Sequence, residues 1–458
     1  MIRLARIAAA AALIALPAAA PAETLADALI AAYRNSDLLE QTRAVLRAAD
    51  EDVAQAVATL RPVIDFAISG TATATDGRRA PGGVGTSDLS AVLRLSADLV
   101  LFDFGANQAA ISAQKEIVLA TRQQLVGVEQ NVLLFAVQAY QGVRTAIERV
   151  NLRESNVRVI ERALRAAQDR FELGEITSTD VAIAQARLAA ARSALEAARG
   201  ELATERERYN LAVGRYPGTL AVPPRAPQTA RTLDEAKAIA RRTHFSIKEL
   251  QHQVAAADLQ VVRAEAAMRP RLGLGAEYSV LQNGADQASL SLRMTQRLYA
   301  GGQLSALFRQ AIARRDAARA RLARAAAEVD DGVGRAWAQV NVARASIAAS
   351  REQVTAAQAA YDGVRQEQEF GARTTLDVLN AEQELLDARA NLITAVSNEY
   401  TATYALLAAM GLLTVDHLRL GIPTYDPAAY YNAVRNAPAT SGRGAALDRV
   451  LGATGRAP

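Results

Sequence analysis

The feature that most constrains this chain is a long stretch without proline. None occurs from Phe104 to Glu172, and glycine is scarce there, so one helix over this range would be about 100 Å long at about 1.5 Å per residue. Helices of ordinary globular domains are several times shorter. Apolar residues recur every seven residues before and after the following turn, at Val143, Val150, Val157, Leu164 and Phe171, then Val181, Leu188, Leu195, Leu202 and Tyr209. This spacing predicts an antiparallel coiled-coil hairpin.

The same organisation occurs twice along the chain. The turn Leu173–Val181, of sequence LGEITSTDV, matches Phe370–Val378, of sequence FGARTTLDV, and the seven-residue spacing returns on both sides of the second turn. Two copies are too few for a solenoid. The simpler interpretation is a duplicated unit that runs helix, two strands, long helix, turn and helix.

These patterns predict boundaries for each segment. The order is a signal peptide at 1–22, a first repeat at 23–214, a linker at 215–232, a second repeat at 233–411, a C-terminal segment at 412–436 and a disordered tail at 437–458. Strands are expected at about 63–72, 88–102, 271–282 and 287–299, long helices at about 104–172 and 302–369, and hairpin helices at about 177–214 and 374–411.

The signal-peptide prediction rests on the first residues of the chain. Arg3 and Arg6 precede an apolar run, after which Ala20 and Ala22 supply the small residues that a signal peptidase needs. The apolar run is shorter than the roughly 20 residues of a membrane-spanning helix. Export is therefore favoured over a membrane anchor.

The four predicted strands alternate apolar and polar residues. Leucine and alanine occupy every second position from Leu89 to Leu101, with Arg94 and Asp98 between them, and each strand has about the 9–11 residues that cross a bilayer. A soluble sheet with one wet face would alternate in the same way, but charged residues such as Arg94, Asp98, Arg293 and Arg297 suit a water-filled lumen. About eight strands are needed to close a barrel, so other subunits would have to complete it.

Composition argues against several other classes of function. Lys and Arg number 52 against 48 Asp and Glu, a net charge of +4, which lacks the basic footprint of a nucleic-acid-binding protein. The chain has no cysteine, which excludes disulfides and thiolate metal sites. Its histidines, His244, His252 and His417, have no metal-binding spacing. We therefore expect no enzyme activity, no cofactor and no metal.

Both turns have a purely local explanation. A glycine falls where a helix C-terminus favours a left-handed residue, and a threonine lies three residues before an aspartate, an acidic version of the capping box. These residues are Gly174, Thr177 and Asp180 in the first turn and Gly371, Thr374 and Asp377 in the second. The sequence leaves open whether capping is the only role of the two aspartates.

At these residues the sequence resembles the TolC-type outer-membrane channel family, in the branch that serves type I secretion and drug efflux. The resemblance extends from about residue 25 to 436, and the stretch Gly371–Arg389 is its most specific part. It implies an α+β membrane protein that forms a homotrimer. Its twelve strands would close one barrel in outer-membrane lipid, and its helices would continue as a coiled-coil barrel through the periplasm.

The resemblance also implies a function. The protein would be the exit duct of a tripartite export system, passing proteins or small toxic compounds to the exterior from an inner-membrane ABC or proton-driven pump. The hairpin ends would open like an iris and dock on a periplasmic adaptor protein. The docking residues would be Leu173, Gly174, Thr177, Phe370, Gly371 and Thr374.

Residue roles in the gate follow from the same resemblance. By this resemblance the arginine that latches the closed state corresponds to Arg373. It would bond Asp180 of the neighbouring subunit, next to Thr179. Two acidic rings of the family fall on Asp377 and Asn380, so only the first is retained. The sequence therefore predicts weaker cation selectivity than in a two-ring channel and a gain in selectivity on Asn380→Asp. A tyrosine of the family's latch falls on Gln368, which departs from the pattern.

Two other classes of protein compete with a channel. A periplasmic coiled-coil adaptor would also carry a signal peptide and a long helical hairpin, and a purely structural coiled-coil protein would share the helices. Two hairpins together with four alternating strands argue against both. The exported substrate and the identity of the partner pump cannot be read from the chain.

Overall fold

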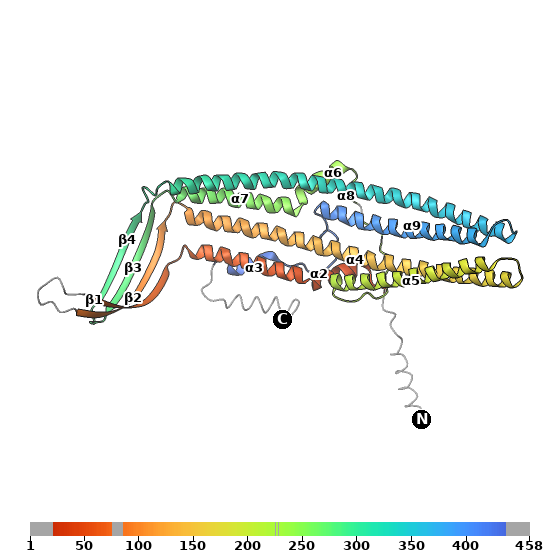
Figure 1. The fold of residues 1–458 in the computed structure, drawn as a ribbon. Coiled ribbons are helices and arrows are strands. Elements are labelled where there is room, and N and C mark those ends of the chain that lie inside the picture. Colours follow the sequence, from red (N-terminus) through yellow and green to blue (C-terminus); the bar gives the residue numbers. More distant parts are fainter. Residues whose placement is uncertain (1–21, 76–85, 225, 228, 437–458) are drawn as a thin grey trace, which may run out of the picture. The chain divides into compact units, whose positions relative to one another are not determined.

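The computed structural model describes residues 22–75, 86–224, 226–227 and 229–436 (Figure 1). The predicted tail and all but the last residue of the predicted signal peptide lie outside the described residues. The elements are α2 (Leu25–Asn35), α3 (Asp37–Ala58), β1 (Val63–Thr75), β2 (Thr86–Phe102), α4 (Ala106–Glu172), α5 (Ser178–Val213), α6 (Leu233–Thr243), α7 (Phe245–Ala266), β3 (Arg271–Leu281), β4 (Asp286–Thr295), α8 (Gln303–Glu369), α9 (Thr375–Ala409) and α10 (Pro427–Val434).

The element order confirms the α+β class and the duplication. Two helices, two strands, a long helix and a shorter helix occur in each half of the chain. Each half opens with two helices where the sequence predicts one, because Ser36 and His244 both adopt an extended backbone and end the first helix of their pair. The His244 side chain then caps α7 by accepting a hydrogen bond from the backbone of Ser246.

The chain forms two compact units that cut across the two repeats. The first, here the hairpin unit, comprises the described residues of 1–36, 132–229 and 336–408; the second, the sheet unit, comprises those of 37–131, 230–335 and 409–458. Helices α4 and α8 contribute to both units.

The sheet unit contains four antiparallel strands in the order β1-β2-β3-β4 (Figure 1). The register pairs Ala67 with Arg94 and Leu95 with Tyr278. β4 ends at Thr295, before the predicted end near residue 299, because its partner β3 begins at Arg271, opposite Thr295, directly after Pro270, which has no backbone N–H to donate. Arg297 therefore lies beyond the ladder.

One face of this sheet is apolar and exposed. Alternation places on it the side chains of Ile64, Phe66, Ile68, Leu93, Leu95, Tyr278, Leu290, Leu292 and Met294, all exposed in the single chain. On the opposite face, Nε of Arg94 lies 3.1 Å from Oε1 of Glu277. The sheet thus has an apolar face and a charged face, as the alternation of the sequence predicts.

The hairpin unit is built on the predicted seven-residue spacing. Residues of that series, together with neighbouring alanines, form one buried cluster between α4 and α5, joined by one residue of α9. Its members are Val150, Val157, Ile160, Ala167, Ala184, Leu188, Ala191, Leu195, Ala198 and Leu379. Alanine brings helix axes close together, whereas leucine and valine fill the seam.

Candidate functional site

The two hairpin ends have the same construction. Gly174 and Gly371 have φ of 74° and 78°, a conformation that favours glycine because a Cβ atom would strain it. The backbone N–H of Gly174 donates to the carbonyl of Phe171, and that of Gly371 donates to the carbonyl of Gln368. Each glycine thus closes the long helix before it and reverses the chain.

A capping box starts the helix after the first turn. The Oδ2 atom of Asp180 accepts hydrogen bonds from the Thr177 backbone at 3.0 Å and from the Thr177 hydroxyl at 2.8 Å. The second turn repeats this, with Oδ2 of Asp377 accepting from the Thr374 backbone at 2.9 Å and from its hydroxyl at 2.8 Å. Each helix N-terminus is therefore stabilised by a side chain of its own first turn.

These hydrogen bonds lower the pKa of both aspartates. For Asp180 the main cause is the bond from the Thr177 hydroxyl, and for Asp377 it is the bond from the Thr374 backbone. A carboxylate that accepts hydrogen bonds is favoured in its charged form. Both aspartates are therefore ionised at neutral pH, and the predicted acidic ring position carries a full charge.

Two apolar side chains project from the hairpin ends. Leu173 is 75% exposed and Phe370 is 88% exposed, and each directly precedes the glycine of its turn. The two turns thus expose large apolar side chains at matching positions, and their role in docking stays a prediction.

Arg373 has a partner within its own hairpin. Its Nε atom donates to Oε2 of Glu367 at 2.8 Å, and both side chains are exposed. Within this one chain the structure does not join Arg373 to Asp180 or Thr179, among the residues it describes. The predicted latch connects two subunits, so it stays a prediction. Nε2 of Gln368, which the sequence analysis singled out as a departure from the family's pattern, lies 3.5 Å from the hydroxyl of Thr375.

Asn380 contacts a residue that the sequence analysis missed. Nη2 of Arg187, on α5, donates to Oδ1 of Asn380, on α9, at 3.0 Å. The two hairpins of one chain are thus joined close to their ends, and a positive charge lies beside the residue predicted to replace a second acidic ring. Arg187 follows Asp180 by about two helical turns on the same face, which is the signal that could have identified it.

In the part of the chain that the structure describes, no group of three or more His, Asp or Glu residues is placed to hold a metal ion. No helix in that part is both long enough and apolar enough to cross a membrane.

The exposed apolar face of the sheet, the long coiled-coil helices and the charged hairpin ends define a subunit of an outer-membrane channel with a helical extension. The chain belongs to the outer membrane efflux protein family, whose sequence model matches residues 29–215 and 238–412.

Individual relatives cover most of the chain. Outer membrane efflux protein BepC of Brucella suis is 36% identical over 427 residues, which span 91% of this chain and 92% of BepC. Protein CyaE of Bordetella pertussis is 30% identical over 418 residues, 87% of either chain. The CmeC outer membrane channel of Campylobacter jejuni matches the fold with a TM-score of 0.75 over 92% of this chain and 90% of CmeC, at 15% identity.

These findings confirm the resemblance seen in the sequence and decide between the classes considered there. The protein is an outer-membrane exit duct with a periplasmic helical extension, rather than a periplasmic adaptor. The family and its structural neighbours are channels, not enzymes.

Proposed function

We propose that three copies of this chain form one channel and that the hairpin ends are its periplasmic gate. The observation that carries the proposal is the four-stranded sheet with one exposed apolar face. Its outer strands, β1 and β4, each have one partner among the described strands. A free strand edge in a bilayer is costly, and three sheets of four strands would supply a closed barrel of twelve (3 × 4).

In this proposal the latch runs between subunits. Arg373 leaves Glu367 of its own hairpin, or shares it, and bonds Asp180 beside Thr179 of the next subunit. Both side chains are charged, Arg373 is exposed and Asp180 is partly exposed, and an ion pair open to solvent contributes only about 0–1 kcal/mol. Three such pairs would hold the gate closed and still yield when a partner protein docks.

The partner would be a periplasmic adaptor attached to an inner-membrane ABC or proton-driven pump. The exposed Leu173 and Phe370 side chains support docking at the hairpin ends, together with the backbone of Gly174 and Gly371 and the caps at Thr177 and Thr374. Exported proteins or small toxic compounds would then pass through the duct with no chemical change.

Single-channel recording of the purified protein in planar bilayers tests this proposal. We expect small discrete openings in the wild type and larger or longer ones in Arg373→Ser. Arg365→Ser is the matched control, because Arg365 is a nearby arginine in the last turns of α8, before the turn that carries Arg373, and its ion pair among the described residues is with Glu369 one turn away. Openings that Arg373→Ser leaves unchanged would remove the latch assignment, and a folded protein that conducts no current would remove the channel.

A further inference from the structure

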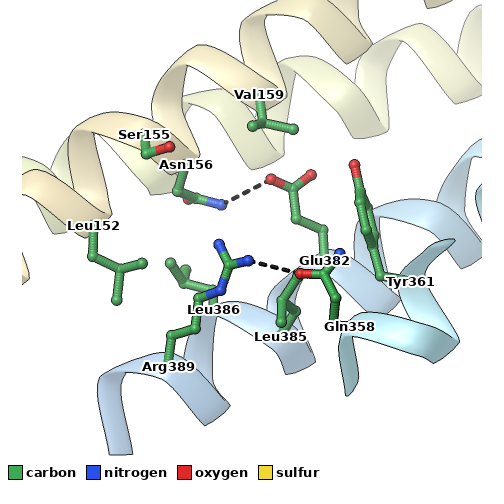
Figure 2. Close-up of a pocket in the computed structure, with 10 residues that line it drawn as sticks. All are labelled: Leu152, Ser155, Asn156, Val159, Gln358, Tyr361, Glu382, Leu385, Leu386 and Arg389. Atoms are coloured by element: carbon green, nitrogen blue, oxygen red, sulfur yellow. Dashed lines mark hydrogen bonds between the residues drawn. The ribbon is translucent and has the colours of Figure 1, made fainter. Parts of the chain in front are cut away.

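A cavity lies between the two hairpins, away from their ends. Its volume is about 110 Å³, and α4, α8 and α9 all contribute to its lining (Figure 2). The apolar part of the lining comes from Leu152, Val159, Leu385 and Leu386. A space of this size holds a few water molecules or a side chain, not an exported compound.

One carboxylate is buried against this cavity. Glu382 is 8% exposed and Asn156 is 6% exposed, and their side chains point toward each other (Figure 2). The Nδ2 atom of Asn156 lies 3.4 Å from Oε1 of Glu382. This contact joins α4 of the first hairpin to α9 of the second, and it is long for a hydrogen bond.

The charged and titratable groups around Glu382 come from all three helices. Arg389, on α9, donates to Oε1 of Gln358 on α8 at 2.7 Å and so is engaged elsewhere (Figure 2). Arg162, on α4, and Arg389 act on Glu382 only through their charge. Tyr361, on α8, also faces the cavity. No ion pair to Glu382 occurs among the described residues.

Burial raises the pKa of Glu382 to about 7, and the contact with Asn156 and the charges of Arg162 and Arg389 offset only part of this effect. A carboxyl group in such surroundings is stable when protonated, because an unpaired charge loses its hydration.

We propose that Glu382 is a positioning residue of the gate, whose protonation holds the two hairpins of a subunit together and whose ionisation loosens them. The proposal rests on the proposed function, since it assumes that the hairpins are the moving part of the channel. The same interface carries the packing of Leu379 on the first hairpin and the Arg187–Asn380 contact, so a change there acts on the hairpin ends.

The direction of the pH effect follows from linkage. When the hairpins separate and water reaches Glu382, its pKa returns toward its ordinary value of 4.5, below the value of about 7 in the packed state. Between these two values the packed state binds more protons, so its stability falls as the pH rises. The two hairpins therefore pack most stably in acid, and their packing is least stable at about pH 7 and above.

The test compares wild type, Glu382→Gln and Glu384→Gln in planar bilayers from pH 5 to pH 8. Glutamine keeps the shape of the side chain but cannot ionise, and Glu384 is an exposed glutamate two residues away on the same helix. We expect the open fraction of wild type and Glu384→Gln to rise by up to about 40-fold between pH 5 and pH 7. We expect Glu382→Gln to stay at the low, acid value throughout. A wild-type pH profile in Glu382→Gln would overturn the proposal while leaving the channel intact.

Amide hydrogen exchange gives a second readout that needs no conduction. After correction for the intrinsic effect of pH, exchange of residues 152–159 and 379–386 should be faster at pH 7 than at pH 5 in wild type and equal in Glu382→Gln. Equal protection at both pH values in wild type would also overturn the proposal, whether or not current is observed.

Discussion

Arg187→Gln tests how charge is distributed at the hairpin ends. From the sequence alone, Asn380→Asp should restore a second acidic ring. The structure adds Arg187, whose Nη2 lies 3.0 Å from Oδ1 of Asn380. The charges of Asp377, residue 380 and Arg187 add up to 0 in each wild-type subunit (−1 + 0 + 1). It is −1 in either single variant and −2 in Arg187→Gln/Asn380→Asp.

We therefore expect the two single substitutions to raise cation selectivity equally and the double variant to raise it further. A unit charge about 5 Å from a permeating ion in water contributes about 0.8 kcal/mol, from 332/(80 × 5). This corresponds to about a fourfold change in local ion population for each added charge. Salt screens the effect, since the Debye length is about 10 Å at 0.1 M.

The assay is the reversal potential of single channels in a potassium chloride gradient, at low and at high ionic strength. Arg199→Gln is the control, because it lies on the same helix about 18 Å from Arg187 by the helical rise and pairs with Glu154. If Arg187→Gln leaves the reversal potential at the wild-type value while Asn380→Asp shifts it, the role assigned to Arg187 is refuted.

Three further predictions concern stability. Thr177→Ala should cost about 1 kcal/mol, seen as faster amide exchange in the first turn of α5. Asp50 is buried, with no hydrogen-bond partner for its carboxylate among the described residues, and burial raises its pKa from 3.8 to about 6. Wild type should thus lose about 2 kcal/mol between pH 4 and pH 6 in denaturant unfolding, and Asp50→Asn should lose much less. A Cβ atom on Gly411 would lie 2.7 Å from the Cα of His244. Gly411→Ala should therefore lower the free energy of unfolding by about 1–3 kcal/mol more than Gly421→Ala. Gly421 is the control because its φ is also positive but no atom lies close to the added Cβ.

Local features of this protein were predictable because their signals are short in range. Alternation from Leu89 to Leu101 correctly indicated a strand with an apolar and a charged face, since successive side chains point to opposite sides. The Thr177 and Asp180 pair correctly indicated a capping box, because its members are three residues apart. The breaks at Ser36 and His244 were missed, since neither residue is a strong helix breaker.

The sequence by itself determined the α+β class, the duplication, the helices and turns, and the family. Only the tertiary structure decided which side chains of the two hairpins meet. Arg187 and Asn380 are 193 residues apart, and Asn156 and Glu382 are 226 apart. A seven-residue pattern is unchanged when one helix slides past another by seven residues, so it identifies the buried face and not the facing residue. Packing of particular side chains selects the register, and that register buries Glu382 and places Arg187 beside Asn380.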